Sequence, residues 1–244
     1  MKRHAIFIAS AMMLATSCQH STIGATVVPQ KPTAFGAALI ESSGGKQLAQ
    51  TGSLLPQPVV VQVNNDQGTA VPGALVQFSA TPGVTFDPPN GLTDSSGQLT
   101  TNVTLGGMTG RYVITASAFD KSHKKLELKL EEIALGYQQT LGRRLNDQFC
   151  ERCHNPESAA ERVSNYDNLE VKPHPFTEGD TLNKMSDADL TAIVTHGGPA
   201  LNKSALMPAW GNTLSRSEVQ ALIAYIRAVA DPPYRNTGPA FAKN

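Results

Sequence analysis

The segment Cys150-Glu-Arg-Cys153-His154 concentrates the metal-binding chemistry of this 244-residue chain. Its two thiols lie three residues apart, on one helical turn, and an imidazole follows directly. A Cys-x-x-Cys pair serves as a dithiol redox centre, as half of a zinc site, or as an attachment point for haem. The surrounding sequence is helical, which does not suit the strand–helix–strand setting of dithiol redox proteins. A zinc site needs more ligands at suitable spacing, and the downstream histidines are His174 and His196.

Covalent haem attachment uses all three side chains of the motif. Two thiols reach the two vinyl groups of the haem, and the imidazole in the next position binds the iron from one side. The motif therefore predicts one covalently attached haem c, held by Cys150 and Cys153, with His154 as an iron ligand.

The second iron ligand is expected downstream, on a loop that can reach the other haem face. Met207 is the candidate, because a thioether is a soft donor that suits low-spin haem iron and raises its potential relative to a second imidazole. Met207 precedes a proline between two expected helices, so a packing role on a helical stripe fits it poorly. Met185 is a competitor that directly precedes a helix cap. A bis-histidine site would instead use His196 or His174.

Helical periodicity begins after residue 135. Apolar residues recur every fourth position in a first helix that runs into Cys150, and two further helices open at capping residues Ser186 and Ser215. The second ends at Gly197-Gly198, and the third ends at Asp231-Pro-Pro233. Residues 155–184 lack periodicity and are expected to be a loop. The first ridge comprises Tyr137, Leu141, Leu145 and Phe149.

Residues 41–134 show a different pattern. Short stretches with alternating or β-branched residues are separated by Gly, Pro, Asn and Asp turns, which is typical of an all-β sandwich. The expected strands are 58–63, 74–79, 98–105, 111–117 and 125–130. No group of His, Cys or carboxylate residues stands out in this part of the sequence.

Several turns in this part resemble those of the bacterial Ig-like domains of invasin and intimin adhesins. They are Asp66-x-Gly68, Val71-Pro-Gly-Ala74, Thr93-Asp94-x-x-Gly97 and Gly110-x-Tyr112-x-x-Thr115-Ala116. In the third, Asp94 can bind backbone amides ahead of it and Gly97 can adopt positive φ. The resemblance covers roughly 90 residues and implies an Ig-like sandwich that acts as a spacer.

Residues 135–235 resemble a mono-haem class I cytochrome c, because Cys-x-x-Cys-His, Met-Pro-x-Trp-Gly and a C-terminal helix with Tyr225 occur in that family's order. The resemblance implies an all-α cytochrome c fold with His154 and Met207 on the iron. It also implies that Trp210 packs near the haem edge or a propionate. The first and last helices should cross, with Phe149 or Leu145 against Tyr225 or Leu222. The stretch 155–184 departs from the family pattern, so Pro173 and Pro175 are only guesses for the carbonyl that orients His154.

The N-terminal residues predict where in the cell the protein is located. Residues 1–18 read as a signal peptide, and Leu14-Ala-Thr-Ser-Cys18 resembles a bacterial lipobox in which Cys18 is lipidated. A signal peptide cut a few residues later, with Cys18 lost, is the alternative. Residues 19–40 are expected to be a flexible linker and residues 236–244 a tail. No other stretch is long enough to span a membrane, so attachment would be through the lipid alone.

Together these features predict an exported one-electron carrier, on the periplasmic side or at the outer membrane, with redox proteins as partners. Lys plus Arg equals Asp plus Glu, 20 against 20, and no basic stripe indicates nucleic acid. A single Cys-x-x-Cys-His makes a two-haem peroxidase a poor fit, so we do not expect an enzyme. The alternative is a haem-containing subunit or sensor/adhesin-type module that docks onto a partner oxidoreductase. Independent folding of the two domains, joined near 134–136, is expected.

Overall fold

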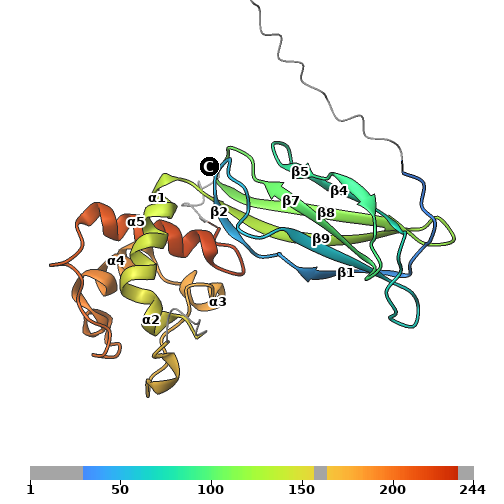
Figure 1. Cartoon of the computed structure of the whole chain (residues 1–244). Coiled ribbons are helices and arrows are strands. Elements are labelled where there is room, and N and C mark those ends of the chain that lie inside the picture. The colour runs from blue at the N-terminus through green and yellow to red at the C-terminus, as the bar shows by residue number, and fades with distance from the viewer. Residues whose placement is uncertain (1–29, 157–163, 236–244) are drawn as a thin grey trace, which may run out of the picture.

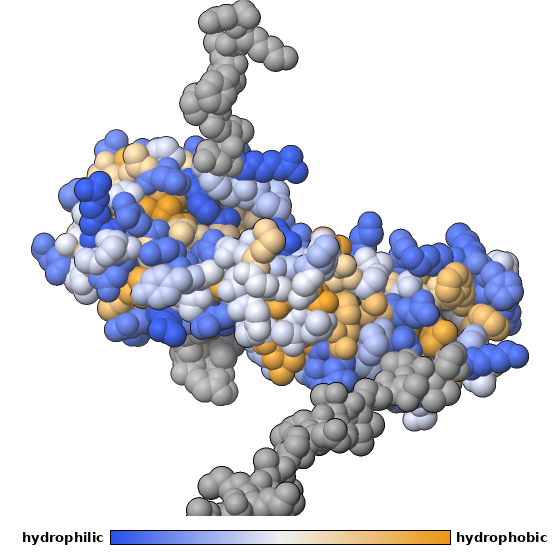
Figure 2. Space-filling view, turned by 90° about the horizontal axis from the view of Figure 1, so that it is seen from above, coloured by the Kyte–Doolittle hydropathy of each residue, from blue (hydrophilic) through white to orange (hydrophobic). Residues whose placement is uncertain are grey.

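The computed structural model describes residues 30–156 and 164–235. The expected signal peptide with Cys18, the first half of the expected linker (residues 19–29) and the tail 236–244 lie outside these ranges. The described chain forms a β-sandwich followed by a helical region at one end of it (Figure 1). Seen from above, the surface is mostly polar, with apolar patches that include one near the middle of the long axis (Figure 2).

The sandwich consists of two sheets with strand orders β1-β3-β7-β5 and β2-β9-β8-β4-β6. Side chains that alternate along each strand fill the space between the sheets, as Val59, Val61 and Val63 do on β3. Neighbouring strands are antiparallel, except that β2 runs parallel to β9. The strands are β1 (Ala38–Ser43), β2 (Leu48–Gln50), β3 (Val59–Asn64), β4 (Leu75–Ala80), β5 (Thr85–Asp87), β6 (Asn90–Leu92), β7 (Gln98–Thr104), β8 (Gly110–Phe119) and β9 (Lys125–Leu135).

Each of the five expected strands is present, and four further strands are short or lie at sheet edges. The expected linker 19–40 is too long, because β1 starts at Ala38 and Ala34 bridges to Ala74. The sequence pattern does not predict this edge strand, because Leu39 is its one buried residue. Its register against β3 depends on a long-range contact. β9 continues to Leu135 because its last residues are covered on both faces, by the sandwich and by the helical region.

One residue, Gly136, separates β9 from the helical region. Its helices are α1 (Tyr137–Leu145), a π-helical turn (Asn146–Cys150), α2 (Glu151–His154), α3 (Gly179–Leu182), α4 (Asp187–His196) and α5 (Arg216–Val229), with 3₁₀ turns at Tyr166–Asn168 and Gly198–Leu201. Both expected capping boxes are present. The Ser186 hydroxyl accepts from the Asp189 amide at 3.0 Å, and the Ser215 hydroxyl accepts from the Glu218 amide at 3.3 Å.

Helices α1 and α5 cross at Gly142, as the close backbone approach shows. A Cβ at Gly142 would overlap the Ala221 carbonyl and would lie 2.7 Å from the Cβ of Tyr225. Leu145 and Leu222 share a core, which agrees with the expected crossing. The apolar ridge expected on the first helix is shorter than predicted, because Tyr137 is 82 % exposed at the first position of α1.

The sandwich and the helical region share one apolar cluster. Ile133 and Leu135 at the end of β9 pack with Tyr225 and Val229 of α5. Hydrogen bonds cross the same junction, including one from Arg143 Nη1 to the Leu48 carbonyl at 3.1 Å. One of the apolar clusters therefore belongs to both parts, and independent folding of the two domains stays a prediction.

No helix among the described residues is long and apolar enough to cross a membrane.

Glu132 is a fully buried carboxyl group near the end of β9. Its Oε2 accepts a hydrogen bond from the Gln47 amide at 2.6 Å, whereas Oε1 has no hydrogen-bond partner among the described residues. Burial raises the pKa of Glu132 to about 7 despite that hydrogen bond, and the charge of Glu41 contributes to the rise. The folded protein thus holds a proton that an unfolded chain releases near pH 4.5.

Stability should therefore fall as pH rises from 4.5 to about 7 and level off above that. At about 1.4 kcal/mol per pKa unit, the difference between 4.5 and about 7 corresponds to a loss of roughly 3 to 4 kcal/mol. Urea unfolding across this range measures it. Glu132→Gln should flatten the decline, whereas Glu127→Gln, at an exposed position on the same strand, should keep it. The same pH slope in wild type and Glu132→Gln would contradict this prediction.

Candidate functional site

The Cys-x-x-Cys-His motif lies where the first helix widens. α1 passes into the five-residue π turn that ends at Cys150, and the single turn of α2 carries Cys153 and His154. Such π turns interrupt the regular helical spacing and often lie at functional sites. Cys150 is buried and Cys153 is half-buried, and both are free thiols.

The Cys150 thiol does not have the properties of a redox-active dithiol. Burial raises its pKa to about 12, and the charges of Cys153 and Asp147 act in the same direction. Dithiol exchange centres instead lower the pKa of their attacking cysteine. Within the described ranges, no three His, Cys, Asp or Glu side chains gather as metal ligands. The structure therefore provides no zinc ligand set around these thiols.

His154 is held in one orientation by a backbone carbonyl. Its Nδ1 lies 2.8 Å from the oxygen of His174. A carbonyl can only accept, so Nδ1 carries the proton and Nε2 keeps its lone pair for a metal. Burial lowers the pKa of His154, which favours the neutral ring that binds iron. The orienting residue is His174, rather than either flanking proline, Pro173 or Pro175.

The loop that carries this carbonyl is structured by its own contacts. The Phe176 ring packs on the His154 ring, with centroids 4.8 Å apart and planes 37° apart. The His174 ring faces the Glu178 carboxylate at 3.0 Å, and the Thr181 hydroxyl donates to the same carboxylate at 2.6 Å. Phe176 has no helical or strand periodicity around it. Its position directly after Pro175, two residues from His174, is the available sequence signal.

Met207 ends a loop that starts at the C-terminus of α4. The Gly198 amide donates to the Met207 carbonyl at 3.0 Å, which closes the loop. Gly197 has φ +81°, and a Cβ there would lie 2.8 Å from the Met207 carbonyl oxygen. The two glycines were interpreted as a helix exit. They also allow the backbone of Met207 to approach closely.

Trp210 lies beside the attachment motif. Its ring centroid is 5.2 Å from that of Phe149, which directly precedes Cys150, with an interplanar angle of 52°. The Trp210 amide donates to the Val194 carbonyl of α4 at 3.0 Å. Trp210 and Phe149 both pack against the core cluster of the helical region. The structure thus brings Trp210 next to the residue that directly precedes the Cys-x-x-Cys-His segment.

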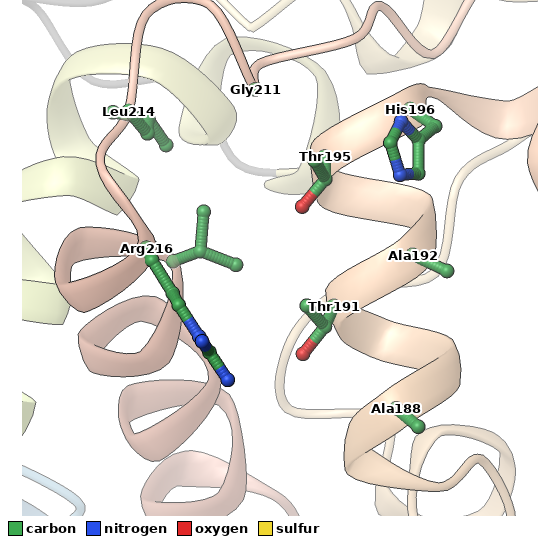
Figure 3. Close-up of a pocket in the computed structure, with 9 residues that line it drawn as sticks. Ala188, Thr191, Ala192, Thr195, His196, Gly211, Leu214 and Arg216 are labelled. Atoms are coloured by element: carbon green, nitrogen blue, oxygen red, sulfur yellow. The ribbon is translucent and has the colours of Figure 1, made fainter.

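A groove of about 590 Å³ lies between α4 and the start of α5 (Figure 3). Thr191 and Thr195 on α4 and Arg216 on α5 line it, and His196 lies at its upper end. Cys150, Cys153, His154 and Met207 are not among its lining residues. His196 therefore lines a groove whose lining does not include the attachment motif.

The residues present fit a haem of the c type. Two free thiols lie three residues apart, and the adjacent imidazole presents Nε2 with its proton held on Nδ1. Aromatic side chains of Phe149, Phe176 and Trp210 pack around the motif. This donor set is the one that the sequence predicts.

Residues 138–226 match the family model described as cytochrome c oxidase, cbb3-type, subunit III. The match indicates a cytochrome c domain. The likeness supports haem binding by this part of the chain. No curated protein matches the chain.

The structural neighbours match the β-sandwich region. The D00-D0 domain of intimin is 16% identical and covers 43% of this chain and 50% of its own, with a TM-score of 0.32. Bacterial invasin is 18% identical, over 40% of this chain and 19% of its own, with a TM-score of 0.32. A β-glycosidase from Bacteroides vulgatus is 14% identical, over 41% and 14%, with a TM-score of 0.31. The chain spans at most about half of these proteins, and likenesses this weak carry no functional information.

Proposed function

We propose that this protein is a c-type cytochrome that carries single electrons. One haem is attached through Cys150 and Cys153, with His154 and Met207 as the iron ligands. The observation that supports this best is the His154 Nδ1 to His174 carbonyl contact, because it leaves Nε2 free directly beside two free thiols. The cytochrome match over residues 138–226 supports the same function.

Haem, when bound, supplies a one-electron iron couple, and the protein sets the conditions for it. The thiols keep the group attached, and the His174 carbonyl holds the proton on Nδ1 of His154. That hydrogen bond orients the imidazole and raises its basicity toward the metal. Phe149 and Trp210 exclude water next to the motif. Burial of this kind is one of the ways in which a protein tunes a haem potential.

The position of His174 favours Met207 as the second ligand. The Nδ1 and Nε2 atoms of an imidazole face opposite sides of the ring. A residue bonded to Nδ1 of His154 therefore lies on the side away from the iron. His174 would have to leave this contact to reach the opposite haem face, whereas Met207 ends a separate loop closed by Gly198.

Met207→Ala should keep the haem attached but change the visible spectrum to that of high-spin haem or of a replacement ligand, with a lower reduction potential. Met185→Ala is the matched control, because it removes the other nearby methionine and should leave both properties unchanged. An unchanged spectrum in Met207→Ala, with a changed one in His196→Ala, would instead assign a bis-histidine site.

Location and partners complete the proposal. We place the protein outside the cytoplasm, on the periplasmic side or at the outer membrane, anchored by acyl groups on Cys18, with the Ig-like sandwich as a spacer and redox proteins as partners. This part rests on the pattern of residues 1–18. Recovery of the wild-type protein in the soluble periplasmic fraction would remove the anchor from the proposal.

A second candidate is a haem-carrying subunit that docks onto a partner oxidoreductase. The matching family, which is described as a subunit of a cytochrome oxidase, favours this role. Stable co-purification with an oxidase, instead of transient exchange, would distinguish this role from that of a free carrier.

A further inference from the structure

We infer that the β-sandwich is part of the haem site, and that Arg111 on β8 is a positioning residue for the loop that holds His154. This inference rests on the proposed function for its redox readout. Two sets of contacts carry it, one hydrogen-bonded and one apolar, and both run from the sandwich to the His154 ring.

The hydrogen-bonded set starts at the C-terminal end of α5. Arg111 Nη2 donates to the Ala230 carbonyl at 2.6 Å and lies 3.4 Å from the Ala228 carbonyl. The last carbonyls of a helix have no partner within it, and they favour a positive charge. Glu131 on β9 pairs with the same guanidinium and fixes its direction. The Arg111 side chain is 20 % exposed, so these bonds are shielded from water.

The chain directly after α5 is bound to the loop before α3. The Asp231 amide donates to the Thr177 carbonyl at 2.8 Å, and the Gly179 amide donates to the Asp231 carbonyl at 3.0 Å. Asn183 Nδ2 donates to the Pro232 carbonyl at 2.8 Å. We call these contacts between residues 231–232 and 177–183 the strap. A Cβ at Gly179 would lie 2.8 Å from the Asp231 carbonyl carbon, so the two segments are in close contact.

The strap continues into the loop that orients His154. His174 and Phe176 lie three residues and one residue before Thr177, and they provide the carbonyl at Nδ1 and the ring against the imidazole. Arg111 thus holds Ala230, the next residue begins the strap, and the strap places the His174 carbonyl. The apolar set runs in parallel, because Phe176 also packs on the cluster that Ile133 and Leu135 of β9 form with α5.

Loss of the Arg111 guanidinium would leave the α5 carbonyls without this donor and would loosen the strap. The hydrogen bond to Nδ1 of His154 would then weaken, and a less basic imidazole stabilises ferric iron less well. We therefore expect Arg111→Ala to raise the reduction potential of the haem. The visible spectrum should still show the second iron ligand in place. Arg111→Lys keeps the positive charge but lacks the planar guanidinium that contacts Glu131 and Ala230 together. Its reduction potential should therefore lie between those of Arg111→Ala and wild type.

The test is amide hydrogen exchange together with potentiometry on the full-length holoprotein. In Arg111→Ala, exchange at the Asp231 and Gly179 amides should accelerate about tenfold or more. The Trp210 amide, bonded to Val194, should exchange as in wild type and exclude general destabilisation. Amide exchange at Asp231 and Gly179 does not depend on which residue is the second iron ligand. It therefore still tests the role of Arg111 if Met207 is not that ligand.

Arg143→Ala is the matched control, because Arg143 also donates across the junction, to Leu48, but has no contact with the strap in the hydrogen bonds of the described residues. It should change neither the potential nor exchange at Asp231 and Gly179. Wild-type exchange and potential in Arg111→Ala would overturn the inference. Equal changes in Arg143→Ala would overturn it too, because they would show a general effect of the junction. If Arg111→Ala does not fold, the same comparison applies to Arg111→Lys.

Discussion

Haem should be lost completely to acid–acetone extraction from the Cys150→Ala, Cys153→Ala double variant, whereas wild type should retain it. Extraction removes haem that is held by coordination and packing alone, and only thioether bonds resist it. The two thiols lie beside His154 and are not paired with each other, so both are available for attachment. The double variant removes both bonds and keeps the imidazole ligand.

Each single variant provides the control for this result. Cys150→Ala and Cys153→Ala should each retain haem through the remaining thioether, with a shifted absorption band because one vinyl group stays unreacted. Haem that resists extraction from the double variant would contradict the attachment site. Equal loss from all three variants would mean that maturation requires both thiols, and mass spectrometry of the wild-type peptide would then have to show both bonds.

Replacement of Gly142 by alanine should destabilise the helical region by about 3 kcal/mol, the upper part of the range for overpacking in a core. Helix propensity alone predicts the opposite sign, because alanine is favoured over glycine inside a helix by about 1 kcal/mol. The added Cβ would overlap the Ala221 carbonyl and would lie 2.7 Å from the Tyr225 Cβ, so α1 and α5 would have to separate.

Gly107→Ala is the matched control, because a Cβ there meets no atom within 4 Å and its backbone needs no positive φ. Its effect should stay within about 0.5 kcal/mol. Urea unfolding followed by haem absorbance and by circular dichroism measures both variants. Stability of Gly142→Ala equal to or above that of wild type would show that the helices have room at the crossing.

The features that the sequence predicted correctly depend on residues close together in the chain. Alternating residues such as Val59, Val61 and Val63 identify a strand that is buried on one face. The Ser-x-x-Glu box at Ser215 identifies the start of α5, because the hydroxyl and the amide that it binds are three positions apart. The Cys-x-x-Cys-His motif is equally local, and its role in haem attachment stays a prediction.

Features that the sequence left open depend on contacts between distant segments. Strand β1 has a weak pattern of its own and is defined by its register with β3. The carbonyl bound to His154 belongs to a residue 20 positions away in a loop without periodicity. Glu132 looks like an exposed carboxylate among the charges of β9, and only the packing around it shows that it is buried.

The sequence by itself determined a β-rich part followed by a helical part, the helix caps, and two thiols followed directly by an imidazole. These properties follow from spacing within one or two turns of chain. The tertiary structure alone decided that the two parts share an apolar cluster and that Gly142 lies at a helix crossing. It also decided that Arg111 reaches Ala230, a residue 119 positions later. Such contacts have no local signature, because any arginine on a strand can donate to any carbonyl that the fold brings near.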